Sequence, residues 1–301
     1  MTRQIESVTA VVLNWNNYND TSSCLKSLLQ LEYPELEFLV VDNGSTDGSG
    51  EKIESEFPEV TLVRTTENLG FAEGMNRGIQ TALSHDSDYI WLLNNDLLVQ
   101  DEFLLGKLVD KIAEDDDIAA ITPLIRSYPD TDDIWFWNGR VNWRSGNGYH
   151  ATVPSSFDNT LISNEYIPFC CTLFSSSVFR DIGLISDSYF LYYEDVDFST
   201  KLRDAGYNII TYTDTEAYHK QRGSSGSRLG PTSSYYMTRN QLLFKHKYHK
   251  RIEKSFPLWF LIDIIQQLMI RVYNRRFDGL LALFRGLKDG IRGKQGQGPY
   301  P

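Results

Sequence analysis

Short apolar runs alternate with helical patterns along residues 8–122. The runs cover 8–15, 36–42, 60–66, 89–95 and 118–122, and the helical patterns cover 21–31, 46–57, 72–84 and 101–114. A Ser45–Thr46 cap is expected to begin the second helix. Continuous apolar strands separated by single helices are typical of a mostly parallel sheet that helices cover on both faces. The pattern therefore predicts an α/β fold, in which ligands bind beyond the carboxyl ends of the strands.

Four of the apolar runs end in short polar residues. The segments "NWNN", "DNGSTDG", "ENLGFAEGMN" and "NND" follow the first four runs in turn. Asn, Asp and Gly often do no more than close a loop. Four such ends at the same edge of one sheet instead indicate a shared polar rim.

The pattern changes after residue 122. Residues 123–170 are predicted to form short antiparallel strands with turns at Asn138–Gly139 and Asn147–Gly148. A helix is expected to start near Ser175–Ser177, and an amphipathic helix is expected to cover Asp195–Ala205. The segments "NIITYT" and "TEAYH" that follow have the composition of strands.

Charge divides the chain near its last quarter. Residues 1–238 hold 16 Lys and Arg against 36 Asp and Glu, whereas residues 239–301 hold 13 against 4. An acidic body argues against nucleic acid as a partner, because phosphate backbones require basic surfaces. Since residues 233–292 also have a helical pattern, we predict a domain at 1–232, with halves at 1–122 and 123–232, and a basic amphipathic helical extension at 233–301.

The cysteines and apolar segments favour a cytoplasmic protein. Cys24, Cys170 and Cys171 do not make a disulfide framework, because adjacent cysteines bridge poorly. The first residues lack the long apolar core of a signal peptide. The most apolar segment, "FPLWFLIDIIQQLMIRVY", is interrupted by four polar residues, so no membrane span is expected.

Isolated carboxylates and one histidine are the candidates for chemistry. Asp96 ends the fourth apolar run, Glu194, Asp195 and Asp197 cluster at a helix start, and His219 ends a strand-like segment. Oxygen ligands with one imidazole suit Mg²⁺ or Mn²⁺ that shares its coordination shell with phosphate oxygens. The alternative is structural, because helix dipoles favour carboxylates in a first turn and a histidine at a strand end often has no function.

Several known sites are absent from the sequence. No G-x-G-x-x-G follows the first strand, which argues against nicotinamide and flavin cofactors. A P-loop is also missing, and without a G-x-S-x-G segment an α/β-hydrolase is not expected.

Six segments together resemble the family-2 glycosyltransferases, most closely the branch with bacterial rhamnosyltransferases and galactofuranosyltransferases. They are "VVLNWNN", "VVDNGSTDGS", "NLGFAEGMNRG", "LLNNDLLV", "FLYYEDVDFSTKLRDAGY" and "AYHKQRGSSG", and the resemblance covers about residues 8–245. It implies a GT-A fold, which has a mostly parallel nucleotide-binding sheet with helices on both faces. A small antiparallel sheet on the acceptor side and a C-terminal helical extension complete the expected architecture.

The resemblance assigns the donor nucleotide to the strand ends. Trp15 would stack on the base, and the Asp42 carboxylate would accept a hydrogen bond from the imide N–H of the base. The loop "NLGFAEGMN" would lie against the ribose and the phosphates. The predicted nucleotide-binding residues are Trp15, Asn14, Asp42, Asn68, Gly74, Asn76, Asn94 and Asn95.

The resemblance also assigns the metal and the catalytic base. Asp96 matches the metal-binding carboxylate of the D-x-D motif, and His219 matches the histidine ligand of the family. Asn94 stands where the first carboxylate of the motif is usual, which lowers the charge at the site. Asp195 matches the catalytic base, with Glu194 beside it, and the implied cofactor is Mg²⁺ or Mn²⁺.

The implied function is an inverting, metal-dependent sugar transfer in cell-surface polysaccharide synthesis. The donor would be dTDP-rhamnose or a UDP-hexose, and the acceptor a hydroxyl of a glycan or a lipid-linked glycan. Arg222 and Arg228 lie in a Gly/Ser-rich loop that is predicted to close over the diphosphate, and a solvated loop without a role is the alternative.

Two other functions stay open at this stage. A nucleotidyltransferase also binds nucleotides on an α/β sheet, but "NWNNYNDTSS" lacks the basic residue that would hold a triphosphate. A nucleotide-sugar or carbohydrate-binding module without activity is the third possibility.

The basic tail contains one strongly apolar helical face. A basic amphipathic helix is typical of an element that lies on a membrane surface. We therefore predict peripheral contact through 255–292 with the inner face of the cell membrane, and the alternatives are packing on the acidic body or in a homodimer interface. The residues of the apolar face are Leu258, Leu261, Ile262, Ile265, Leu268, Met269 and Val272.

Overall fold

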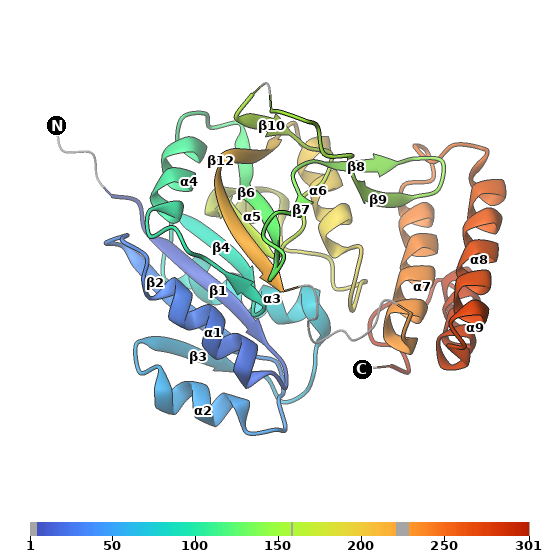
Figure 1. Ribbon diagram of the computed structural model, residues 1–301, viewed down its shortest axis with the longest axis horizontal. Coiled ribbons are helices and arrows are strands. Elements are labelled where there is room, and N and C mark those ends of the chain that lie inside the picture. The colour runs from blue at the N-terminus through green and yellow to red at the C-terminus, as the bar shows by residue number, and fades with distance from the viewer. Residues whose placement is uncertain (1–4, 158, 221–228, 301) are drawn as a thin grey trace.

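A central mixed sheet organises the molecule. The computed structural model describes residues 5–157, 159–220 and 229–300. In this part of the chain ten strands form one sheet, whose main path is β10-β12-β6-β11-β4-β1-β2-β3, with β5 on β12 and β7 on β6 (Figure 1). The strands are β1 Val8–Asn14, β2 Leu36–Asp42, β3 Val60–Arg64, β4 Tyr89–Asn94, β5 Leu97–Leu98, β6 Ile118–Tyr128, β7 Ile134–Phe136, β10 Leu161–Ser163, β11 Cys171–Ser175 and β12 Asn208–Lys220. A separate two-stranded antiparallel sheet pairs β8 Gly139–Asn142 with β9 Asn147–His150.

Helices pack on both faces of the central sheet, and three more form a group at one end of the molecule (Figure 1). The helices against the sheet and its edges are α1 Tyr18–Leu28, α2 Ser49–Glu56, α3 Gly70–Ser84, α4 Leu104–Ile112, α5 Ser176–Ile182 and α6 Glu194–Asp204. The terminal group is α7 Pro231–Lys247, α8 Phe256–Tyr273 and α9 Phe277–Ile291.

Parallel pairing brings the polar strand ends to one edge. β1 runs parallel to both β2 and β4, and the register sets Asn14 beside Asp42 and Leu13 beside Asn94. On the other side of β4, strand β11 is antiparallel and joins β4 to β6. The rim expected from the sequence is therefore formed at the carboxyl ends of β1, β2 and β4.

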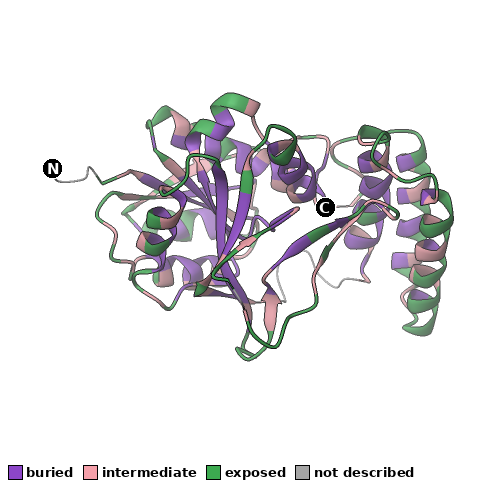
Figure 2. Ribbon diagram, turned by 90° about the horizontal axis from the view of Figure 1, so that it is seen from above, coloured by how far each residue is buried: buried purple, intermediate pink, exposed green. Residues whose placement is uncertain are grey.

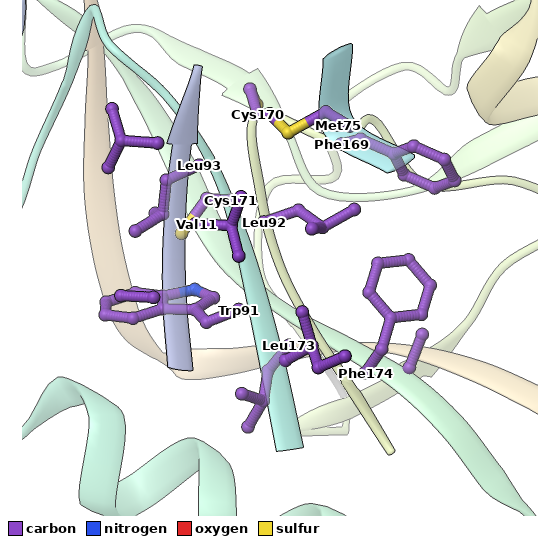
Figure 3. Packing of buried hydrophobic residues seen from close by; sticks show 14 of the residues in the cluster. Val11, Met75, Trp91, Leu92, Leu93, Phe169, Cys170, Cys171, Leu173 and Phe174 are labelled. Atoms are coloured by element: carbon purple, nitrogen blue, oxygen red, sulfur yellow. The ribbon is translucent and has the colours of Figure 1, made fainter. Parts of the chain in front are cut away.

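The side chains in the core of the sheet are closely packed. Trp91 of β4 and Leu173 of β11 are fully buried and lie close together (Figure 3). On the opposite face, Val11 of β1 meets α3 at Gly78, where a Cβ atom would lie 2.2 Å from the valine Cγ1. A larger residue at position 78 would therefore push α3 away from the sheet.

Two details of the sequence reading were wrong. The β8–β9 hairpin turns at 143–146, whereas Asn138–Gly139 and Asn147–Gly148 are at the beginnings of the two strands. Helix α2 begins at Ser49 after Gly48, because the Ser45 hydroxyl is used elsewhere: it accepts the Asn16 N–H at 2.9 Å. The segments "NIITYT" and "TEAYH" are strand, as expected, and they belong to one strand, β12, with a shift of register between them.

The C-terminal helices form a bundle of their own that contacts the sheet domain. In α9, a Cβ atom on Gly286 would lie 2.4 Å from the Tyr235 carbonyl oxygen of α7, so the two helices approach closely. The outer side of this group is largely exposed (Figure 2). Contrary to the expectation from the sequence, α8 is long and apolar enough to cross a membrane in spite of its polar residues. Only 17% of its 18-residue window is buried.

Candidate active site

A cavity of about 560 Å³ opens at the polar rim of the sheet. Its walls come from the carboxyl ends of β1 and β4, the start of α6, the end of β12, and the β7 and β9 strands. Such a cavity has the size of a small-molecule site. The lining residues are Leu13, Trp15, Asn43, Asn68, Gly70, Phe71, Asn94, Asn95, Asp96, Trp135, His150, Tyr166, Pro168, Phe169, Cys170, Phe190, Leu191, Tyr192, Glu194, Asp195, His219 and Thr232.

Asp96 and His219 meet in this cavity although they are far apart in sequence. Strand β12 pairs His219 with Leu97 of β5, and the Lys220 N–H donates to the Asp96 carbonyl at 2.9 Å. The imidazole Nε2 thereby lies 3.1 Å from Asp96 Oδ1. The ring of Trp135 packs on the imidazole with a centroid separation of 4.6 Å.

The polar atoms around this pair fit a divalent cation. The 3.1 Å contact is not aligned as a hydrogen bond, so Asp96 Oδ1 and both ring nitrogens of His219 are buried polar atoms without a hydrogen-bond partner in the described residues. Asn94 Oδ1 and Glu194 Oε2 are likewise buried and have no hydrogen-bond partner in the described residues. Unpaired buried polar groups are costly, and they cluster where a ligand satisfies them.

The described residues contain no group of three or more His, Cys, Asp and Glu side chains that could hold a metal ion. One carboxylate and one imidazole are nevertheless enough for an ion that takes its other oxygen ligands from phosphate and water, which is the usual situation of Mg²⁺ at a nucleotide. The donor set therefore fits Mg²⁺ or Mn²⁺ held jointly with a diphosphate.

Two carboxyl groups at the start of helix α6 also line the cavity. Burial raises the pKa of Glu194 well above its usual range, and the neighbouring Asp195 charge adds to the effect. Burial likewise raises the pKa of Asp195 to about 6, although a 2.8 Å hydrogen bond from the Val196 N–H acts to lower the pKa. A carboxyl with a pKa near the working pH can both take and release a proton, as a general base must.

The backbone before this pair is strained. Tyr192 and Tyr193 have φ angles of 67° and 77°, which bulky residues rarely adopt. The Asn240 amide of α7 holds the turn by donating to the carbonyl oxygens of Leu191 and Tyr192, both at 2.8 Å. The Tyr193 hydroxyl adds a 2.6 Å hydrogen bond to Asn147 Oδ1 on β9. Helix α7 thus helps to orient the carboxyl pair, although the sequence assigned most of it to the extension.

A buried chain of hydrogen bonds fixes the strand ends. The Asn95 amide donates to the Thr21 hydroxyl at 3.0 Å, and that hydroxyl donates to Asn14 Oδ1 at 2.8 Å. The Asn14 amide in turn donates to Asp42 Oδ1 at 3.0 Å. These contacts tie the ends of β1, β2 and β4 together at the cavity.

The predicted site residues separate into three groups. Trp15, Asn68, Asn94, Asn95, Asp96, Glu194, Asp195 and His219 line the cavity. Asn14, Asp42, Gly74 and Asn76 are not among its lining residues. Arg222 and Arg228 fall outside the described residues.

The four residues behind the wall have internal contacts. The Asn76 amide donates to the Ile185 carbonyl at 2.8 Å and its oxygen accepts the Ile185 N–H at 3.1 Å. A Cβ atom on Gly74 would lie 2.8 Å from Leu13 Cδ1, so this glycine serves close packing. The nucleotide contacts expected of Asn14, Asp42, Gly74 and Asn76 therefore stay predictions.

The lining residues that the sequence reading did not single out include Asn43, His150, Tyr166 and Thr232. Asn43 follows Asp42 in a quoted segment, and its amide donates to Asn68 Oδ1 at 3.1 Å and to the Gly70 carbonyl at 2.9 Å. The position of Asn43 in the polar strand end was a usable signal. His150, Tyr166 and Thr232 had none, because only the fold brings β9, the segment before β11 and the start of α7 together.

Comparison with known proteins shows the family of the chain. The family model "Glycosyl transferase family 2" matches residues 9–183. The chain is 26% identical to an N-acetylglucosaminyl-diphospho-decaprenol L-rhamnosyltransferase of Mycobacterium tuberculosis over 213 residues, which are 62% of this chain and 67% of the relative. It is 22% identical over 291 residues to the dTDP-rhamnosyl transferase RfbF of Shigella flexneri, covering 94% of this chain and 96% of the relative.

A solved structure shares the fold. The crystal structure of GalNAc-T7 with UDP, GalNAc and Mn²⁺ matches with a TM-score of 0.67 at 14% identity, over 84% of this chain. This chain spans only 50% of the length of that protein. The mostly parallel nucleotide-side sheet, the small antiparallel sheet and the C-terminal helices confirm the GT-A architecture expected from the sequence.

The fold and the matched residues define a glycosyltransferase with a GT-A fold. The chain belongs to glycosyl transferase family 2.

Proposed function

We propose that this enzyme transfers a sugar from a nucleoside diphosphate to a hydroxyl of a glycan or lipid-linked glycan, with inversion at the anomeric carbon and with a bound divalent cation. The observation that supports the proposal most directly is the shared cavity. The Asp96–His219 pair, the Glu194–Asp195 pair and Trp15 all line it.

In this mechanism one pair of residues holds the leaving group and the other receives the proton of the attacking group. Asp96 and His219 would hold Mg²⁺ or Mn²⁺, which when bound stabilises the negative charge of the departing diphosphate. Trp15 offers an aromatic surface to the base of the nucleotide. Asp195 accepts the proton of the acceptor hydroxyl as the hydroxyl oxygen attacks the anomeric carbon, and Glu194, whose pKa is raised by burial, lies beside it.

The names of two relatives support a donor and an acceptor class. RfbF is named a dTDP-rhamnosyl transferase, and the mycobacterial relative is named for a diphospho-decaprenol acceptor. We therefore infer dTDP-rhamnose as the first donor, a UDP-hexose as the second, and a polyprenyl-linked sugar at the cytoplasmic membrane surface as the acceptor.

Donor hydrolysis without acceptor gives a direct test. The purified protein with Mn²⁺ or Mg²⁺ is expected to release nucleoside diphosphate slowly from one donor of a panel with dTDP-rhamnose, UDP-galactose, UDP-galactofuranose and UDP-N-acetylglucosamine. Chromatography of the nucleotide products provides the measurement. If no donor is hydrolysed and none raises the melting temperature in the presence of metal, the proposal is wrong.

The pH dependence of transfer should report Asp195. Because the pKa of this carboxyl is raised to about 6, the base is increasingly protonated below that pH. We expect kcat/KM to fall by about tenfold per pH unit below the pKa and to level off above it. An ordinary aspartate would remain ionised down to about pH 4, so a flat profile between about pH 7 and pH 5 contradicts the assignment.

A further inference from the structure

Helix α8 has its apolar face on the outside. Among the residues expected to form that face, Leu258 is 59% exposed, Leu261 55%, Met269 67% and Val272 55%. Ile265 is 46% exposed, and the neighbouring Trp259 and Tyr273 are exposed as well. This finding removes packing of the face on the acidic body as an explanation.

The inner face of α8 carries polar residues beside the buried Phe256 and Ile264. Arg271 is 3% exposed, and its Nε donates to the Ser234 hydroxyl of α7 at 2.9 Å. Burial raises the pKa of Asp263, whose carboxylate accepts hydrogen bonds from Gln241 and Gln267. A surface helix in water has the reverse arrangement, with its polar face outward. The exterior of α8 is therefore built for contact with something apolar.

Helix α9 extends the same surface. Its exposed apolar residues are Phe277, Leu281, Phe284 and Ile291. Phe284 and Ile291 also line a shallow hollow of about 300 Å³ with Leu287, Lys288 and Arg292. The opposite side of α9 packs on α7, so this exposed face is fixed in place by the fold. We call the exposed apolar residues of α8 and α9 the outer apolar face.

Positive charge accompanies the outer apolar face. Arg275, Arg285, Lys288 and Arg292 are all exposed, on α9 or directly before or after it. In a symmetric dimer through this face, the same basic residues of two copies would approach one another. An anionic bilayer surface complements both features, since apolar side chains enter the acyl boundary and basic side chains contact lipid phosphates.

We propose that the outer apolar face docks this enzyme on an anionic lipid bilayer, with α8 and α9 lying in the interface. The helices do not cross the bilayer in this arrangement. α9 follows α8 after residues 274–276 and carries exposed charges along its length, including Asp278 and Lys288. Such charges are costly in a hydrocarbon core. The docking deepens the proposed function, because a polyprenyl-linked acceptor would be presented at the same surface.

Vesicle flotation of the full chain tests the docking. We expect binding to vesicles with phosphatidylglycerol and weaker binding to pure phosphatidylcholine, with a strong decrease at high salt. The double variant Leu261→Glu/Met269→Glu is expected to lose tenfold or more of its partitioning, because two charges would enter the acyl boundary. Gln266→Glu is the control for each single substitution, since Gln266 is also exposed on α8 and gains one negative charge, as Leu261→Glu and Met269→Glu each do. Arg285→Glu should reduce binding to the anionic vesicles alone, by about fivefold or more.

Donor hydrolysis separates this inference from the proposed function. The double variant should hydrolyse the donor at the wild-type rate, because its substitutions are on the outer apolar face. Equal flotation of the wild type and the double variant overturns the docking, as does absence of flotation at low salt. A stable dimer by light scattering that the double variant abolishes would assign the face to a second copy and also overturn it.

Discussion

Replacing Asp195 by asparagine is expected to lower kcat by about 10²–10⁴-fold while the affinity for nucleotide is retained. The variant keeps the size and shape of the side chain but cannot accept the proton of the acceptor hydroxyl. The base in this position begins helix α6 and has a pKa raised to about 6 by burial. The measurement is steady-state transfer together with calorimetric titration of the nucleoside diphosphate.

Asp187→Asn provides the matched control for this result. Asp187 is an exposed carboxylate in the segment before Tyr192 and Tyr193, and it does not line the cavity. The control variant should transfer at the wild-type rate. Transfer within threefold of wild type by Asp195→Asn would show that another group takes the proton, and Glu194 would be the next candidate because it lines the same wall.

Replacing Asp96 by asparagine is expected to lower kcat/KM by about 10²–10³-fold and to weaken Mn²⁺ binding in the presence of nucleoside diphosphate. Its Oδ1 atom is buried, has no hydrogen-bond partner among the described residues and lies 3.1 Å from His219 Nε2, so the carboxylate charge would attract a cation at this point. Electron paramagnetic resonance of free Mn²⁺ measures the binding without relying on turnover.

The control for the metal prediction is Asp101→Asn. The Asp101 carboxylate pairs with Lys107 at 2.6 Å and is not among the cavity residues. This variant should bind Mn²⁺ as the wild type does. Transfer that persists after EDTA treatment, or Mn²⁺ affinity unchanged in Asp96→Asn, would remove Asp96 and His219 as metal ligands.

Much of the architecture was predictable because the strands of this sheet are short, apolar and bounded by polar residues. The strand expected at 36–42 is β2, and the helices at 72–84 and 101–114 correspond to α3 and α4 with boundaries shifted by a few residues. The predicted position of the hairpin turn was wrong because Asn–Gly pairs also occur at strand starts. Helix α2 began later than expected because the Ser45 hydroxyl binds the β1 loop. Local sequence does not show which partner a hydroxyl will choose.

The sequence by itself determined the polar rim at the strand ends, the buried strand that carries Asp96, and the family. Periodicity and motif order report these features because both are local properties of the chain. Only the tertiary structure decided that His219 lies against Asp96, that Asn14 and Asn76 have internal hydrogen bonds, and that the apolar face of α8 turns outward. The physical reason is that a pattern shows which side chains share a face of an element, whereas the packing of distant elements decides what that face meets.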